Sequence, residues 1–128
     1  MFAATGGALT EEKKALLKAL EDVQAMIGHM VGVAMESQEN PKEVYKVGLN
    51  TSRLLMAAGE LIIAWLLLRQ ADIAQSKLAT AGKDTDFYTG KIASAKFFVR
   101  SVLPHISVER AVVESESGEI MDIAEGAF

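Results

Sequence analysis

Apolar positions in the first third of the chain recur at steps of three and four, the spacing of one side of an α-helix. They are Leu16, Leu20, Val23, Ile27, Met30 and Ala34. Thr10 precedes them as the expected N-cap, and Glu11 and Glu12 follow in the first turn, where the helix dipole favours carboxylates. The pattern predicts an amphipathic helix that ends near Met35.

A second helix is predicted from residue 41 to about residue 81. Asn40 is its expected N-cap, and Pro41 takes the first helical position, where its missing N–H is harmless. The 15 residues of segment 54–68 are apolar except for Glu60, so the run is shorter than the roughly 20 residues of a membrane span and contains a carboxylate. We therefore expect this helix to lie at the centre of a bundle, with neighbours on several sides.

The segment 80–86 predicts a tight turn, because Gly82 lies near a helix end and Asp84 or Thr85 follows as the next cap. The next apolar positions predict a third helix, antiparallel to the second: Tyr88, Ile92, Ala95, Val99, Val102 and Ile106. Pro104 lies inside this pattern, so we expect a kink or a break there. An acidic tail follows, with apolar side chains that are able to dock onto the bundle: Ile120, Met121, Ile123 and Phe128.

These elements predict an all-α fold, an antiparallel bundle of three to four helices with a long central helix. We expect residues 1–128 to form one domain, because a chain of 128 residues is long enough to enclose a single core.

Composition narrows the expected partners and location. The chain has 13 basic and 17 acidic residues, a net charge of −4, so it has no cationic excess for nucleic acid or for an anionic lipid surface. The absence of cysteine excludes disulfides, thiolate metal sites and thiol nucleophiles. The first residues do not resemble a secretion signal, and we expect a cytoplasmic protein.

The sequence lacks the patterns of a self-contained enzyme. Neither His29 nor His105 follows a glutamate by three residues, so the Glu-x-x-His pairs of di-iron bundles are absent. Both are expected to be ordinary histidines at the surface or the edge of the core. A nucleophile elbow, a phosphate-binding loop and a dinucleotide fingerprint are also absent. We therefore assign no catalytic, cofactor-binding or metal-binding residue.

Glu60 is the one polar residue that calls for an explanation, because a carboxylate in an apolar turn is costly unless it finds a cation or several donors. It is either a catalytic base or a structural group, in an ion pair or in contact with a neighbouring domain. Without a second catalytic group we favour the structural role, with Arg100 or His105 within reach. Gly28 and Gly32 form a pair of small residues that lets another helix approach closely.

Three segments, taken in order, resemble the extra C-terminal domain of long-form bacterial acyl-CoA dehydrogenases. They are AGELIIAWLLLRQADIA, DFYTGKIASAKFFVRSVLP and EIMDIAEGAF. The marks are a Gly-Glu pair before an apolar run with Trp65, then Tyr88 with Gly90 and Lys91, the Phe97–Phe98 and Leu103–Pro104 pairs, and an acidic tail that ends in Phe. The resemblance covers roughly residues 9–128.

The resemblance implies a helical bundle attached after the regions that carry the chemistry. Such enzymes use FAD to remove two hydrogens from the α and β carbons of an acyl-CoA thioester, and a glutamate takes the α proton. The flavin pocket and that glutamate belong to an upstream body that is missing here. The resemblance thus assigns no catalytic or cofactor residue to this chain, leaves Glu60 without the base role, and implies that the chain alone is inactive.

In related very-long-chain enzymes, the comparable domain packs on the enzyme body and has been linked to membrane association. By analogy, the expected partners are the rest of the parent dehydrogenase and a second subunit in a homo-oligomer. Two alternatives stay open: a free-standing helical adaptor that binds another protein, and a peripheral membrane module, which the acidic balance disfavours.

Overall fold

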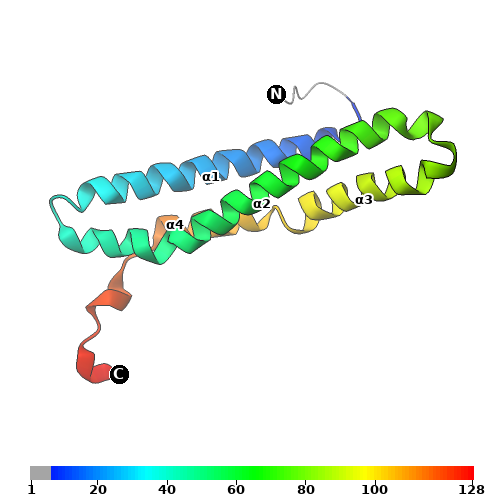
Figure 1. Ribbon diagram of the computed structural model, residues 1–128. Helices are drawn as coiled ribbons and strands as arrows, with labels where there is room; N and C mark the ends of the chain where they lie inside the picture. The colour runs from blue at the N-terminus through cyan, green and yellow to red at the C-terminus, as the bar shows by residue number, and fades with distance from the viewer. Residues whose placement is uncertain (1–6) are drawn as a thin grey trace.

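Four α-helices make up most of the computed structural model, which describes residues 7–128 (Figure 1). α1 (Thr10–Glu36) and α2 (Val44–Lys77) form an antiparallel hairpin. α3 (Thr85–Ser101) runs back along α2, and α4 (His105–Ser115) continues beside α1 and α2. Short 3-10 turns complete the fold: η1 (Pro41–Glu43), η2 (Leu78–Thr80), η3 (Gly82–Asp84), η4 (Glu119–Asp122) and η5 (Glu125–Ala127). The predicted all-α bundle of three to four helices is confirmed.

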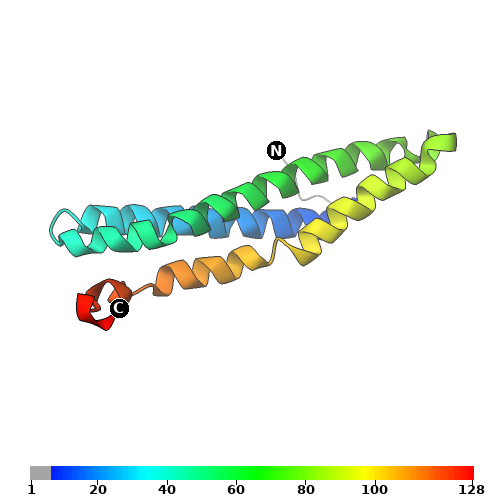
Figure 2. The same cartoon turned by 60° about the horizontal axis from the view of Figure 1, so that its bottom comes forward.

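Proline and glycine mark the helix ends, as predicted. Pro41 is the first residue of η1, which leads into α2. Gly82, the first residue of η3, has a φ of +54°, a left-handed conformation that costs glycine little. α3 ends at Ser101 and α4 begins directly after Pro104, so the predicted break is confirmed and is visible in Figure 2.

The start of α1 differs from the prediction. Thr10 is the first helical residue, and its hydroxyl accepts a hydrogen bond from the Gly7 N–H at 3.1 Å and donates one to the Gly7 carbonyl. The N-cap is Leu9, a buried residue with a φ of 71°. Such a backbone costs a residue other than glycine roughly 1–2 kcal/mol, and burial of the leucine side chain offsets this cost.

The core lies where α1, α2 and the α3–α4 pair meet. Its members are Leu9, Leu16, Ala19, Val23, Met26, Met30, Ala57, Ala64, Leu68, Ala71, Ala74, Ile92, Ala95, Val99, Leu103, Ile106 and Val113. α2 contributes mostly alanine to it, so its neighbours pack close to the α2 backbone. The largest fully buried side chains are Met26, Leu68 and Ile106.

α2 is the long central helix that the sequence predicted, because it contacts α1, α3 and α4, but these neighbours do not enclose it. Its buried positions form one stripe: Asn50, Ala57, Ala64, Leu68, Ala71 and Ala74. Leu55 on another side of the helix is 70% exposed. The reason is geometric, because residues 7–128 supply α2 with only two neighbours, α1 and the α3–α4 pair.

The buried face of α1 is rotated about the helix axis relative to the predicted face. Leu16, Val23 and Met30 are buried as expected, but Leu20 and Ile27 are 40% and 46% exposed. In their place α1 buries Ala19, Met26 and Val33. α1 has more apolar positions than one face can hold, and its packing on α2 and α4 buries the side with Ala19 and Met26.

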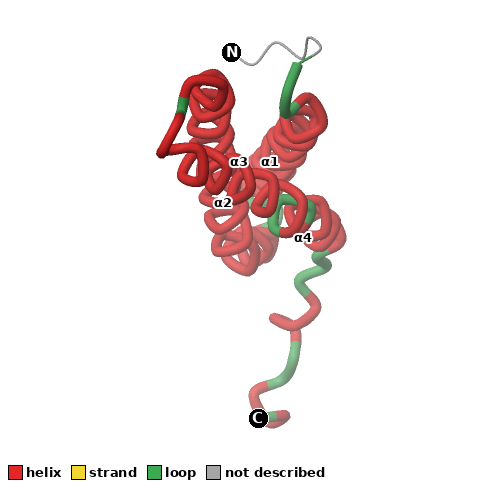
Figure 3. The backbone as a smooth tube through the Cα atoms, turned by 90° about the vertical axis from the view of Figure 1, so that its right-hand side faces the viewer, coloured by secondary structure: helices red, strands yellow, loops and turns green. Residues whose placement is uncertain are grey.

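The acidic tail projects away from the bundle (Figure 3). Its apolar side chains are exposed, Phe128 to 94%, so the expected docking of Ile120, Met121, Ile123 and Phe128 does not occur. An ion pair of 2.8 Å between Lys42 Nζ and Asp122 Oδ1 ties the tail to η1. Both side chains of this pair are exposed, so it adds little stability.

Asn50 is a polar residue within the core, and its replacement by leucine is expected to stabilise the chain. Its Nδ2 donates to the Lys46 carbonyl at 3.0 Å, but its buried Oδ1 has no partner. Because an unpaired buried acceptor costs about 1–3 kcal/mol, Asn50→Leu should raise the free energy of unfolding by roughly 1 kcal/mol in urea titrations. A lower free energy of unfolding for Asn50→Leu would show that Oδ1 is paired in solution.

Candidate docking surface

A stripe of exposed apolar side chains follows α2 on the side opposite its buried stripe. Its members are Leu55, Ile62, Leu66 and Ile73, which are 70%, 54%, 43% and 54% exposed. Steps of seven, four and seven residues place them on one side of an α-helix. They have no neighbour within residues 7–128 that removes them from water.

A second apolar stripe on α1 lies next to the first. An ion pair of 2.8 Å between Lys13 Nζ and Asp72 Oδ1 joins the antiparallel helices α1 and α2. We call the combined surface the α1–α2 face: Leu17, Leu20, Ile27, Val31, Leu55, Ile62, Trp65 and Leu66, all more than one-third exposed.

α2 also has the length and composition of a membrane-spanning helix. Among the described residues, one such segment occurs, Pro41–Thr80, whose most apolar 18-residue window has a mean hydropathy of 1.6 and is 17% buried. Core helices of soluble proteins meet the same criterion, although they are mostly buried. This window resembles such core helices only in composition, because most of it is exposed. Its exposed apolar surface therefore needs another explanation.

Glu60 lies near His105, one of the two residues that the sequence placed within its reach, but its buried Oε2 makes no hydrogen bond. Its Oε2 lies 3.8 Å from His105 Nδ1, across the contact between α2 and α4. His105 Nε2 is 2.9 Å from Glu109 Oε1, and Arg53 Nη1 donates to Glu109 Oε2 at 2.7 Å. Arg100, the other candidate partner, does not reach Glu60 and pairs with Glu12 instead. The cluster connects two helices.

A hollow of about 270 Å³ opens beside this cluster. It is lined by Ser52, Arg53, Met56, Ala57, Glu60, His105 and Glu109. Two carboxylates and one histidine share it, but among residues 7–128 no group of three or more His, Cys, Asp or Glu side chains is arranged so that it could hold a metal ion. His29, the other histidine, is partly exposed on α1 and lies outside this cluster.

Ion pairs between buried carboxylates of α1 and more exposed arginines connect α1 to α3 and α4, and sequence reasoning missed them. Arg100 Nη2 on α3 donates to the buried Glu12 Oε1 at 2.6 Å. On α4, Ser107 Oγ and Arg110 Nη1 donate to the buried Asp22, at 2.5 and 3.0 Å. Both carboxylates lie in a helix with many charged residues. Only their partners, which come from distant parts of the sequence, distinguish them from the exposed charged residues of α1. We call this set the α1–α4 ion pairs.

The surroundings of these two carboxylates change their pKa values. Burial alone raises the pKa of Asp22, but hydrogen bonds from Lys18, Ser107 and Arg110 more than offset burial and lower the pKa below its ordinary value. The pKa of Glu12 is also lowered: burial acts upward, and its own backbone N–H and the Arg100 guanidinium outweigh that effect. Both groups are therefore carboxylates at neutral pH.

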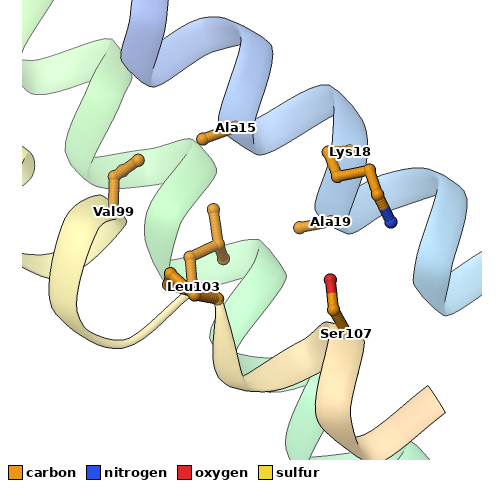
Figure 4. A pocket seen from close by; sticks show the side chains of 7 residues that line it. Ala15, Lys18, Ala19, Val99, Leu103 and Ser107 are labelled. Atoms are coloured by element: carbon orange, nitrogen blue, oxygen red, sulfur yellow. The ribbon is translucent and has the colours of Figure 1, made fainter. Parts of the chain in front are cut away.

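Figure 4 shows a small pocket next to these ion pairs, where the break at Pro104 leaves room beside α1. It has a volume of about 170 Å³. Its lining residues are Ala15, Lys18, Ala19, Val99, Leu103, Pro104 and Ser107. The alanines of α1 leave the space open, and the polar groups at its edge already bind Asp22.

Gly28 and Gly32 do not have the expected role within this chain. A Cβ atom built at either glycine has nothing within 4 Å, so no described helix approaches α1 at these positions. The same holds for Gly59 in α2.

Trp65 is an exposed member of the α1–α2 face, and its replacement should cost little stability in this chain. The indole is 41% exposed, with the Arg69 guanidinium 5.1 Å from the ring centre. Trp65→Ala is expected to lower the free energy of unfolding by roughly 1 kcal/mol, far less than the 3–5 kcal/mol of an enclosed aromatic ring. Thermal and urea unfolding of both chains measure this, and a loss above about 3 kcal/mol would show an enclosed ring.

Comparison with known proteins identifies the family. Residues 1–124 match the family model described as "Acetyl-CoA dehydrogenase C-terminal like". The chain belongs to this family. The resemblance found in the sequence is thereby confirmed, and the bundle is a C-terminal domain of the acyl-CoA dehydrogenase type.

Relatives of this C-terminal family member are much longer proteins. The chain is 42% identical over 127 residues to the broad-specificity linear acyl-CoA dehydrogenase FadE5 of Mycobacterium tuberculosis, a match of 98% of the chain and 21% of that protein. Two butyryl-CoA dehydrogenases of Syntrophomonas wolfei are 38% and 35% identical, over 64% and 62% of the chain and 14% of each enzyme. The chain therefore spans about a fifth or less of the length of these relatives.

Proposed function

We propose that this chain is a non-catalytic domain of an FAD-dependent acyl-CoA dehydrogenase, which introduces a double bond between the α and β carbons of a fatty acyl-CoA. The domain covers part of the enzyme body or helps to assemble its subunits. In this proposal the chain alone is inactive, and its partners are the rest of the polypeptide and a second copy in a homo-oligomer.

One observation carries the proposal. The match to the acyl-CoA dehydrogenase FadE5 covers 98% of this chain but 21% of that protein, which leaves most of an enzyme outside this bundle. The exposed α1–α2 face supports a packing role, because contiguous apolar surface of this kind marks an interaction site.

The described hollows do not fit FAD, which supports a flavin site elsewhere in the parent enzyme. The hollow at Glu60 presents two carboxylates, and its basic side chains, Arg53 and His105, already pair with Glu109 rather than being available to the pyrophosphate of the dinucleotide. A shallow hollow of about 490 Å³ at Phe97 is lined by Leu67, Ala93, Ser94, Phe97 and Phe98, so Ser94 is its one polar side chain. We assign no residue of this chain to flavin or thioester binding.

The proposed location is the cytoplasm, without insertion into a membrane. Glu60 lies in the middle of the apolar run of α2 and contacts His105 of α4, an arrangement that favours protein rather than lipid around this helix. Sedimentation with liposomes tests this part, since the chain is expected to stay in the supernatant.

The functional test compares three proteins. They are the product of the full reading frame, the same product truncated before residue 7 so that it lacks this domain, and this chain alone. We expect the full product to contain FAD and oxidise acyl-CoA. The cut product should show a lower melting temperature or a changed oligomer mass, and this chain should show no turnover. Acyl-CoA oxidation by this chain alone, or a full product without flavin, would refute the proposal. A cut product of unchanged stability and mass would refute the packing role.

A further inference from the structure

The three valleys between neighbouring helices differ in how far the chain closes them. The valley between α1 and the α3–α4 pair is bridged by the α1–α4 ion pairs, in which Glu12 and Asp22 are 4% and 1% exposed, and only the small pocket at Pro104 stays open beside them. Its polar groups bind each other, so this side of the molecule needs no further partner.

The groove between α2 and α3 is mixed in character. One hollow of about 190 Å³ is lined by Gln70, Ile73, Ala74, Phe87, Tyr88 and Lys91, and Lys91 lies 5.4 Å from the centre of the Phe87 ring. Phe97, farther along α3, is 68% exposed. Gln70 and Lys91 interrupt the aromatic side chains of the first hollow, so a partner docked there would have to satisfy or desolvate them. The apolar part of this groove is confined to the hollow at Phe97, where Ser94 is the one polar side chain.

The α1–α2 face differs from both, because it is apolar and open. Between Leu17 and Val31 its stripe on α1 has one polar member, Gln24, and from Leu55 to Leu66 its stripe on α2 has none. Gly59 lies in the middle of the α2 stripe, where an added Cβ meets nothing in this chain. A helix-interior glycine costs about 1 kcal/mol relative to alanine, and it allows a second backbone to come close.

We propose that the α1–α2 face is the surface on which the enzyme body of the same polypeptide docks. This inference rests on the proposed function. About four-fifths of the length of FadE5 lies outside the matched segment. An enzyme body much larger than the bundle is therefore available to cover the α1–α2 face. A C-terminal domain joins that body at the beginning of α1, which contributes half of the face and is absent from the α2–α3 groove.

The covalent connection makes docking of the body an intramolecular event. An attached neighbour is present at an effective concentration in the millimolar range for a short linker, far above that of a free second copy. The matching surface on the body is apolar and uncharged at its centre. It includes a helix or similar ridge that enters the valley between α1 and α2, because helices pack ridges into grooves.

The test uses the full-length enzyme with aspartate placed on each candidate surface. Ile62→Asp and Ile27→Asp change the α1–α2 face, and Phe97→Asp is the matched control in the α2–α3 groove. All three side chains are about half exposed or more in this bundle, so circular dichroism should show an intact domain. We expect Ile62→Asp and Ile27→Asp to speed tryptic release of the C-terminal domain by about tenfold or more, whereas Phe97→Asp leaves it unchanged.

The outcomes separate the possible occupants. Faster release by Phe97→Asp alone would place docking in the α2–α3 groove and overturn the inference. A change of oligomer mass without faster release in Ile62→Asp would assign the face to a second copy, which also overturns it. Flavin content of the unmodified full-length protein is measured in parallel, so that failure of the proposed function is distinguished from failure of the docking assignment.

Discussion

Replacing Asp22 by alanine is expected to lower the free energy of unfolding by about 2–3 kcal/mol, because a buried carboxylate that accepts three hydrogen bonds is lost. Asp22 is 1% exposed and accepts hydrogen bonds from Lys18, Ser107 and Arg110. Its loss leaves the Arg110 guanidinium without that partner and removes a main connection between α1 and α4. Urea unfolding monitored by circular dichroism measures the change.

Glu21 provides a matched control for this substitution. It precedes Asp22 in the same turn of α1 but is exposed, so Glu21→Ala is expected to change stability by less than about 0.5 kcal/mol. Equal effects of the two substitutions would show that the connection between α1 and α4 does not depend on Asp22.

The same carboxylates predict how stability depends on pH. The folded-state pKa values of Asp22 and Glu12 lie below their ordinary values of 3.8 and 4.5, so each carboxylate stabilises the fold at pH values above the ordinary value. This stabilisation is lost as the pH falls from there through the folded-state pKa. The melting temperature should therefore fall below about pH 4.5, and Asp22→Ala should flatten that fall.

Replacing Leu68 by alanine is the second large expected effect, a loss of about 3 kcal/mol in the free energy of unfolding. Leu68 is fully buried in the C-terminal half of α2, and it is the one large apolar side chain in a buried stripe made mostly of alanine. Neighbouring alanines have no side-chain length with which to fill the cavity. The substitution removes contacts with the core and leaves a void.

Leu66→Ala is the control, because the same change is made two residues away on the α1–α2 face. Leu66 is 43% exposed, so its truncation should cost less than about 1 kcal/mol in the isolated chain. In the full-length enzyme the cost should rise if the face is covered. Similar losses for both substitutions in the isolated chain would contradict the burial pattern of α2.

Local rules predicted the elements of this fold well. Pro41, Gly82 and Pro104 act on their own backbones, so their effects on helix ends depend little on the rest of the chain. The prediction of Thr10 as the N-cap was wrong, because Thr10 is the first helical residue and its hydroxyl bonds to the backbone of Gly7. A single capping side chain has several possible partners, and the sequence alone does not rank them.

The candidate site was harder to predict, since apolar periodicity does not say which surface is covered by the same chain. Trp65 and Ile62 sit in a run that is apolar on all sides, and the sequence favoured a central helix. The bundle covers one side and leaves the α1–α2 face open. Asp22 shows the reverse case, because a charged residue on α1 is buried by partners more than 80 residues away.

The most direct measurement is the intact mass and flavin content of the native gene product that contains this segment, purified from its own cells. The account predicts a polypeptide several times longer than 128 residues that carries bound FAD, with this bundle as its C-terminal domain. A free 128-residue protein without flavin would contradict the account, and the α1–α2 face would then belong to a separate partner.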